Sequence, residues 1–426
     1  MNKNCLGFVD AAQMNPQSGD CRNGQLSETL NKLRLIVFGD GQIASRPIVW
    51  LLGFFAFLNV YAMQAVLPTV MHEFQATPVQ AGYTVGATVL GIALMSPFMG
   101  MLSDAWGRKP IIVISMFALT LPTALIGLAD SLTLIVLLRF LQGLAVPGIV
   151  VVLVAYLSEE FRSGGLARLT TTYVAGTVMG GFSGRFISGH MGDWLGWRAA
   201  FVTLALLNLM GAVVVLWYLP ASRKFEAHSN FSGAMQVLLK HLSNPRLLAI
   251  CAVGFCVLFT MVGTFTYLNF YLAAPPFSLS SGGLGNVFLV YLVGALVTPF
   301  AGSVIARHGF LPSMLGGLAC SASGLALTLV PSLPVILLGL TLCSCGVFVC
   351  QSATIGRIAD RVTEGRSLAT GLYYMSYYAG GACGSWITGL AFERYAWSGA
   401  VLSVALFQLF AGLVAVRYLR AGNAAG

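Results

Sequence analysis

The chain has 426 residues, of which 57% are hydrophobic and 9% are charged, and its mean hydropathy is +0.82. Soluble globular domains carry about 25% charged residues, so this composition excludes an ordinary soluble protein. The formal net charge of +9 is compatible with nucleic acid or anionic lipid as a partner, so the positions of the basic residues have to be examined.

Residues 1–46 are polar and lack the apolar core of a signal peptide, so we expect a cytoplasmic tail that stays attached and is mostly disordered. After this tail, long apolar runs alternate with short polar loops. A helix needs about 20 mostly apolar residues to cross a bilayer. The runs that meet this requirement are 48–71, 79–102, 110–129, 132–157, 168–190, 199–219, 247–273, 284–306, 312–331, 333–355, 367–391 and 398–418.

One long polar interval, 220–246, separates the sixth run from the seventh and divides the chain into halves. The sequence therefore predicts an all-α membrane protein of twelve transmembrane helices. We expect a six-helix bundle at 47–219, a cytoplasmic linker at 220–246, a second six-helix bundle at 247–418 and a cytoplasmic tail at 419–426.

Lys and Arg are distributed unequally between alternate loops. When the first tail is assigned to the cytoplasm, the segments on its side hold 19 of the 23 basic residues. The opposite side holds Arg198 and Arg394, and Arg139 and Arg185 fall within apolar runs. Because basic loops resist translocation, both termini are predicted in the cytoplasm of a bacterial inner membrane. This distribution accounts for the positive charge without nucleic acid.

An internal repeat supports the division into halves. Gly100, Gly107 and Pro110 after the second run match Gly302, Gly309 and Pro312 after the eighth. Six residues around the fifth run recur 200 residues later, at the eleventh: Gly180, Gly181, Gly184, Ile187, Gly189 and Trp197 match Gly380, Gly381, Gly384, Ile387, Gly389 and Trp397. Many transporters build two such halves around a central site.

The loop between the second and third runs reads Gly100-x-x-x-Asp104-x-x-Gly107-Arg108-Lys109. It resembles the signature loop of the major facilitator superfamily, and the twelve-run topology is similar to that family along the whole chain. In the family, the glycines permit a tight turn, and the aspartate and the following basic residue form a charge lock that closes when the transporter faces outward. The resemblance implies a fold of two pseudo-symmetric six-helix bundles.

The same resemblance implies which residues form this cytoplasmic gate. The lock would join Asp104 to Arg108, with Glu159 or Glu160 as the acidic partner at the inner end of the fourth run. Ala306 replaces the aspartate in the second copy, which argues against a symmetric second lock.

Arg139, Gln142 and Gly143 in the fourth run are similar to the R-x-x-Q-G signature of the family's drug:proton antiporters. The resemblance implicates Arg139 in proton coupling. At 1.5 Å per residue, Arg139 lies roughly 10 Å below the outer boundary of its run, a depth that requires a wet cavity or a partner. Substrate, water or Gln142 is expected to supply much of its stabilisation. The alternative is that its side chain snorkels to the headgroups.

Glycines recur four residues apart in the fifth run, at Gly176, Gly180 and Gly184. Gly176, Gly180 and Gly181 form a degraded copy of the antiporter signature G-P-x-x-G-G, because Thr177 stands where proline is expected. Small faces allow helices to approach closely. We predict that the fifth helix packs on the eighth through this face, and that the second packs on the eleventh, where Gly380 and Gly384 lie.

No Asp or Glu lies in the middle of a run, whereas cationic-drug exporters of the family usually carry such a carboxylate. Arg139 and Arg185 are the charges within the runs, so the electrostatics favour a neutral or anionic substrate. Proton coupling would then use a carboxylate at the rim, such as Glu73 or Asp130.

In the family, helices one, four, seven and ten line the central path. Each polar or aromatic residue there is as compatible with helix–helix contact as with substrate binding. The cavity candidates are Asn59, Gln64, Gln142, Tyr267, Asn269 and Gln351, with Tyr374 and Tyr378 of the eleventh run.

The leading hypothesis is a secondary transporter that exports a small neutral or anionic organic compound by alternating access, coupled to protons. A proton-coupled importer of a sugar or organic acid is the alternative. ATP is not the expected driver, since no G-x-x-x-x-G-K-[ST] occurs, and the absence of H-E-x-x-H and G-x-S-x-G argues against an enzyme. The nine cysteines form no C-x-x-C, so we expect no metal, cofactor or disulfide, and a monomer in the bilayer.

Overall fold

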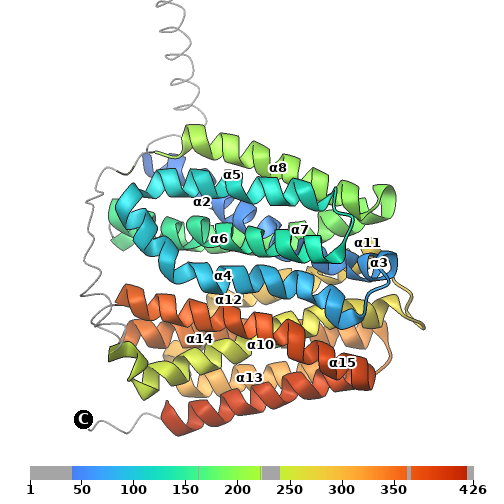
Figure 1. Ribbon diagram of the computed structural model, residues 1–426. Coiled ribbons are helices and arrows are strands. Elements are labelled where there is room, and N and C mark those ends of the chain that lie inside the picture. The colour runs from blue at the N-terminus through green and yellow to red at the C-terminus, as the bar shows by residue number, and fades with distance from the viewer. Residues whose placement is uncertain (1–40, 162, 221, 223–239, 362–365, 420–426) are drawn as a thin grey trace, which may run out of the picture. The chain divides into compact units, whose positions relative to one another are not determined.

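A computed structural model of the protein describes residues 41–161, 163–220, 222, 240–361 and 366–419. Most of the predicted first tail, linker and final tail therefore lies outside the described residues. Residues from Ile48 onward belong to one compact unit, and its described elements are all helices (Figure 1).

The first half contains six spans, of which the first is broken. Its pieces are α2 (Gly41–Leu58), the 3-10 helix η1 (Ala62–Val66) and α3 (Leu67–Glu73). Helix α2 begins inside the segment predicted as a tail. The other five spans are α4 (Pro78–Trp106), α5 (Arg108–Ile126), α6 (Leu132–Glu160), α7 (Ser163–Leu195) and α8 (Trp197–Tyr218).

The second half repeats this order. Its elements are α10 (Pro245–Ala273), α11 (Ser281–Val287), α12 (Leu289–His308), α13 (Phe310–Leu327), α14 (Leu333–Arg361) and α15 (Arg366–Tyr418). Helices α11 and α12 together form the eighth span. Helix α15 contains the eleventh and twelfth spans, which are separated by non-helical backbone at Tyr395 and Ala396.

Length and hydropathy qualify nine of the described helices as membrane spans, or ten when the bent segment Ser281–His308 counts as one. Helix α15 was counted once there but contains two spans, which gives eleven. Helix α7 is the twelfth span, although its many Gly, Ser and Thr residues lower its hydropathy. The described residues thus contain the twelve predicted spans.

The two halves share their turn geometry as well as their order. Gly107 and Gly309 have φ angles of 95° and 84°, and each joins the second span of its half to the third. Gly196, with φ 86°, and Ala396, with φ 50°, join the fifth span to the sixth. Only glycine adopts such backbone without strain, so Ala396 occupies a turn built for glycine. These matches confirm the internal repeat.

The glycine face of the fifth span packs on the first span, not on the eighth as predicted. A Cβ added at Gly176, Gly180 or Gly184 would lie 1.9 to 2.2 Å from a main-chain oxygen of α2. Gly380 and Gly384 approach α10, the first span of the second half, in the same way. The prediction was wrong because a small-residue face shows that a helix is approached closely but not which helix approaches it.

The fifth and eighth spans do meet, but near one end, where a Cβ at Gly189 would lie 2.5 Å from the main-chain oxygen of Ser281. The second and eleventh spans pack together as predicted, through Gly82 and Gly86 of α4, although Gly380 and Gly384 of the predicted face meet α10 instead. A Cβ at Gly86 would lie 2.1 Å from the Oγ of Ser385, and one at Gly82 would lie 3.5 Å from its main-chain oxygen.

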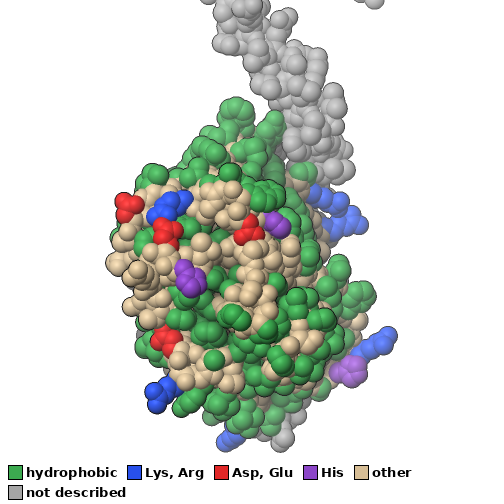
Figure 2. All heavy atoms as spheres, turned by 90° about the vertical axis from the view of Figure 1, so that its right-hand side faces the viewer, with side chains coloured by type: hydrophobic (Ala, Val, Ile, Leu, Met, Phe, Trp, Pro, Cys, Tyr) green, Lys and Arg blue, Asp and Glu red, His purple; other side chains and the backbone are tan. Residues whose placement is uncertain are grey.

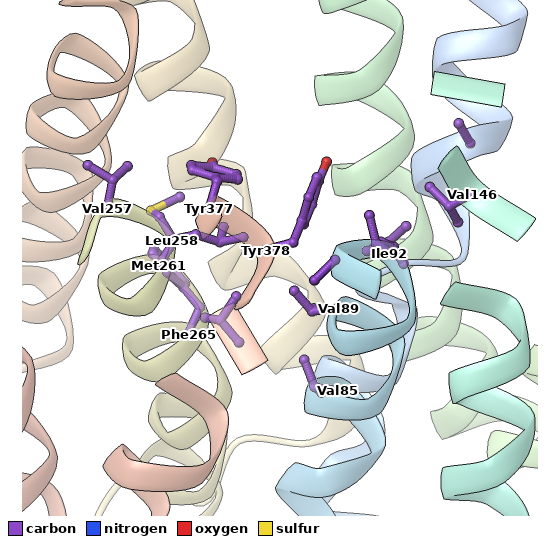
Figure 3. Close-up of a cluster of buried hydrophobic side chains, with 14 of the residues drawn as sticks. Val85, Val89, Ile92, Val146, Val257, Leu258, Met261, Phe265, Tyr377 and Tyr378 are labelled. Carbon is purple, nitrogen blue, oxygen red and sulfur yellow. The ribbon is translucent and has the colours of Figure 1, made fainter. Parts of the chain in front are cut away.

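Apolar side chains fill the space between the halves near the second, seventh and eleventh spans. Figure 3 shows Val85, Val89 and Ile92 of α4 on one side, with side chains of α10 and α15 opposite. Gly381 lies between the two groups, because its Cβ would be 2.9 Å from both Val89 and Leu258. Close packing and dispersion between these apolar side chains therefore help to hold the halves together here.

Gly180→Ala is expected to lower the thermal midpoint of the purified protein by on the order of 5 °C, because the new methyl group would lie 2.0 Å from the main-chain oxygen of Phe54. The matched control is Gly316→Ala, on the exposed side of α13, where a Cβ meets nothing within 4 Å. Alanine favours helix there, so its midpoint should stay or rise. Equal midpoints for the two variants would contradict the packing of α7 on α2.

Candidate functional site

A cavity of about 290 Å³ lies between the two halves. Its wall comes from α2, η1, α6 and α7 of the first half and from α10, α12, α14 and α15 of the second. Among the predicted cavity residues, Gln64, Gln351, Tyr374 and Tyr378 line it. Since both halves contribute, a bound molecule would contact each of them.

Six tyrosines line this cavity, four of which the sequence reading missed: Tyr61, Tyr173, Tyr291 and Tyr377. Tyr374 and Tyr378 stack with their ring centroids 6.3 Å apart. The sequence signal that was available is the spacing of Tyr373, Tyr374, Tyr377 and Tyr378, which places aromatic rings on one side of the eleventh span.

Three predicted cavity residues instead make hydrogen bonds inside the helix bundle. The Nδ2 of Asn59 donates to the Oδ1 of Asn208 over 3.5 Å. Tyr267 donates to the main-chain oxygen of Ser385. The Nδ2 of Asn269 donates to the main-chain oxygen one turn earlier on its own helix, at 2.5 Å. None of the three belongs to the cavity wall described above, so they are corrected to packing residues.

Arg139 is completely buried and lies where the first span breaks. Its Nη1 donates to the main-chain oxygen of Asn59 and to the Oε1 of Gln142, both at 2.7 Å. Its Nη2 donates to the main-chain oxygen of Val60, and its Nε donates to that of Thr84 at 3.0 Å. The guanidinium therefore joins the first, second and fourth spans.

The side chain does not snorkel, which was the alternative considered for Arg139. Gln142 accepts one of its hydrogen bonds, as expected, but main-chain oxygens, which were not expected, accept the other three. Gln142 extends this hydrogen-bond network to the third span, because its Nε2 donates to the Oγ1 of Thr123 at 2.7 Å. Gly143 allows α4 to approach α6, since its Cβ would lie 2.1 Å from the main-chain oxygen of Thr88. Arg139, Gln142 and Gly143 all lie outside the cavity wall.

Arg185 lies in the cavity wall and is 2% exposed. Its Nε donates to the Oε1 of Gln64 at 2.7 Å, and its Nη1 donates to the main-chain oxygen of Gly181 at 2.7 Å. Three aromatic rings surround the guanidinium, with centroids 4.6 to 4.7 Å from its central carbon: Tyr61, Phe288 and Tyr291. Two of these rings belong to the second half, so Arg185 contacts both halves.

Arg108 lies between two carboxylates at the opposite end of the first half from α3. Its Nη1 is 2.5 Å from the Oδ1 of Asp104, and its Nη2 is 2.5 Å from the Oε1 of Glu159. The same Nη1 donates to the Oγ of Ser103. The cluster thus joins the end of α4, the start of α5 and the end of α6.

The remaining predicted gate residues surround this cluster. Gly107 supplies the turn with positive φ between α4 and α5, Lys109 follows Arg108 in α5, and Glu160 is the last residue of α6. A Cβ at Gly100 would meet nothing within 4 Å, so packing in this structure gives no reason for a glycine there.

The end of the bundle that carries α3 and α11 is here called the α11 end. There, one carboxylate of each half accepts hydrogen bonds from the other half. The Oδ2 of Asp193 accepts from the Oγ of Ser280 at 2.6 Å and from the main-chain N–H of Gly282 at 2.9 Å. The Oε1 of Glu393 accepts from the main-chain N–H of Val79 at 3.1 Å. Each carboxylate lies at the end of the fifth span of its half and meets the start of the second span of the other half.

Asp193 and Glu393 are 200 residues apart, the offset of the internal repeat. The sequence signal was therefore present, but a change from Asp to Glu concealed it. Three further hydrogen bonds join the halves near this end: Thr69 to Ser281 at 3.1 Å, Gln64 to Thr266 at 3.0 Å, and His190 to Asn286 at 3.1 Å. Figure 2 shows side chains packed across this face, with charged groups scattered among apolar ones.

The rim carboxylates considered for proton coupling have different surroundings. Glu73 accepts from the Nε1 of Trp197 at 2.5 Å and pairs with Arg198, so it joins the first span to the sixth within one half. Asp130 is exposed in the loop before α6. Neither lies in the cavity wall.

The sequence model of the Major Facilitator Superfamily matches residues 49–298 and 274–425. The inner membrane transport protein YnfM of Escherichia coli (strain K12) is 32% identical over 369 residues, which cover 86% of this chain and 88% of that protein. The MFS-type transporter YybF of Bacillus subtilis (strain 168) is 30% identical over 368 residues, with coverages of 86% and 91%. The chain therefore belongs to the major facilitator superfamily and is a membrane transporter, not an enzyme.

The fold agrees with that of a solved transporter. A bacterial homologue of the human lysosomal transporter Spinster, in an inward-facing and occupied conformation, superposes with a TM-score of 0.72 at 16% identity. The match covers 89% of this chain and 98% of that one. The fold of two six-helix bundles predicted from the sequence is thus confirmed.

Arg139→Lys is expected to lower the thermal midpoint of the purified protein and to reduce transport by about tenfold or more. A lysine ammonium cannot reach the three main-chain oxygens that the planar guanidinium joins. Because Arg139 lies outside the cavity, the affinity for substrate measured on folded protein should change less than about twofold. A variant with normal stability and strongly weakened substrate binding would contradict this structural role.

Proposed function

We propose that the protein is a secondary active transporter that exports a small neutral or anionic organic compound in exchange for protons, by alternating access. The observation that carries this proposal is the cavity whose wall both halves supply, closed at the α11 end by hydrogen bonds between the halves. A site between two rigid bundles becomes accessible from one side at a time when the bundles rock about it.

The membrane orientation belongs to this proposal. The unequal distribution of basic residues supports a cytoplasmic location for both termini and the Arg108 cluster, and a periplasmic location for the α11 end. The structure then corresponds to a state closed toward the periplasm. Release of substrate there requires the bonds of Asp193 and Glu393 to break, while the Arg108 cluster would take part in closing the cytoplasmic side.

Exchange for protons is proposed because Arg139, Gln142 and Gly143 are similar to the antiporter motif. The described residues place no carboxylate in the cavity wall, so the proton-binding groups are assigned to the ends of the spans. Asp193 and Glu393 are carboxylates at these ends, and both accept hydrogen bonds from the opposite half.

Transport in inverted membrane vesicles tests the direction and the coupling ion. Compounds are first chosen by comparing the resistance of deletion and overexpressing strains to a panel of organic acids and neutral toxic compounds. An exporter should accumulate the chosen compound in inverted vesicles with an acidic interior, and a protonophore should abolish the accumulation. Accumulation only in right-side-out vesicles would instead establish a proton-coupled importer.

Cross-linking of the α11 end provides a second test. In a background without native cysteines, Thr69→Cys combined with Ser281→Cys places two thiols where the wild-type hydroxyl oxygens are 3.1 Å apart. Oxidation should form a disulfide across the halves and reduce transport at least about tenfold, and reductant should restore it. The single variants serve as controls. Undiminished transport by the cross-linked protein would contradict alternating access through this end.

A further inference from the structure

The cavity wall carries a single charged side chain, Arg185, among the described residues that line it. At 2% exposure, this guanidinium has little contact with bulk water. Removing a cation from water is costly unless a counter-charge or a full set of acceptors replaces the hydration. The hydrogen-bond partners of Arg185 therefore show which of its N–H groups the protein itself satisfies.

Arginine has five N–H donors, and hydrogen-bond acceptors within the described part of the chain engage two of those of Arg185, at Gln64 and Gly181. Three aromatic rings add electrostatic attraction, but no described carboxylate pairs with it. Arg139 differs, because it donates four hydrogen bonds and lies outside the cavity. Arg185 is thus the buried arginine with donors available to a ligand.

The rest of the wall specifies the other end of that ligand. Six tyrosines line a space of about 290 Å³, together with mostly apolar side chains such as Met261, Val262 and Phe348. A small inorganic anion would leave the aromatic surface without contacts. Stacking between aromatic rings favours a flat apolar body.

We propose that the substrate is an organic monoanion, in which a carboxylate on an aromatic or similarly flat apolar body binds Arg185 in the manner of a bidentate ion pair. One cation matches one negative charge, so dianions bind less well. The apolar body lies among Tyr374, Tyr377 and Tyr378. This assignment rests on the proposed function, since it takes the cavity as the transport site.

Ligand binding to the purified full-length protein in lipid nanodiscs tests the assignment without a transport assay. The probes are benzoate, cinnamate and 2-naphthoate, each paired with its primary amide, which has nearly the same shape and no charge. Acetate, inorganic phosphate and glucose complete the panel. Binding is measured by thermal stabilisation and by calorimetry.

At least one aromatic carboxylate is expected to bind on the order of 10- to 100-fold more tightly than its amide, the range that follows from one charge-assisted hydrogen-bond pair. Arg185→Gln should remove this preference, and Arg185→Lys should retain part of it, because lysine keeps the charge but loses the planar fork. The matched control is Arg417→Gln, which removes a charge from an exposed position at the end of α15.

The proposal is overturned if amides bind as tightly as carboxylates, if Arg185→Gln leaves carboxylate affinity unchanged, or if no carboxylate binds at millimolar concentration. Should Arg185→Gln fail to fold, the comparison of carboxylates with amides on the wild type decides alone. Proteoliposomes separate this proposal from the proposed function. Transport of a neutral compound but of no carboxylate would overturn only the assignment of the anion, whereas tight carboxylate binding without any transport would overturn only the function.

Discussion

The break in the first span depends on one interaction, the hydrogen bonds from Arg139 to the main-chain oxygens of Asn59 and Val60. A helix that stops inside a bilayer exposes main-chain groups that lipid cannot satisfy. Arg139 satisfies them from the fourth span and holds the second span through Thr84. The pairing benefits both partners, because a buried guanidinium needs acceptors as much as the broken helix needs donors. This explains why an arginine at this depth requires neither a carboxylate nor a cavity.

The shape of the transport cavity follows from the same break. After Val60, the chain turns into η1 and brings Tyr61 and Gln64 to Arg185, which binds Gln64 and lies against the Tyr61 ring. Phe288 and Tyr291 of the other half complete the surroundings of this guanidinium. Because Arg185 contacts both halves, a ligand that competes for it would also change how strongly the halves hold together. The two buried arginines thus have separate roles: Arg139 maintains the first span, and Arg185 faces the ligand.

Hydropathy and glycine spacing predicted the twelve spans and the two-fold repeat, because burial in lipid leaves few alternatives to long apolar helices. The partner of the fifth span could not be predicted, since α2 meets it largely with the backbone of the large residues Trp50, Phe54 and Leu58, and Gly53 alone does not form a recognisable small face. Arg185 was identified as a charge within a span, but its aromatic surroundings come from two segments distant in the sequence, at Tyr61 and at Phe288 and Tyr291, that no local pattern joins. The break at Asn59 could not be seen in the sequence, because the run 48–71 stays mostly apolar on both sides of it. The hydrogen bond of Glu393 to the other half was indicated only by its position, 200 residues after Asp193.

The most direct test of these separate roles is a cryo-electron microscopy structure of the wild-type protein in lipid nanodiscs with its tightest-binding aromatic carboxylate. The account predicts density for the carboxylate within hydrogen-bonding distance of Arg185 and for the apolar body among the tyrosines of α15. Arg139 should retain its bonds to Asn59 and Val60 in the same structure. A ligand bound to Arg139, or one that occupies the cavity with its carboxylate away from Arg185, would contradict it.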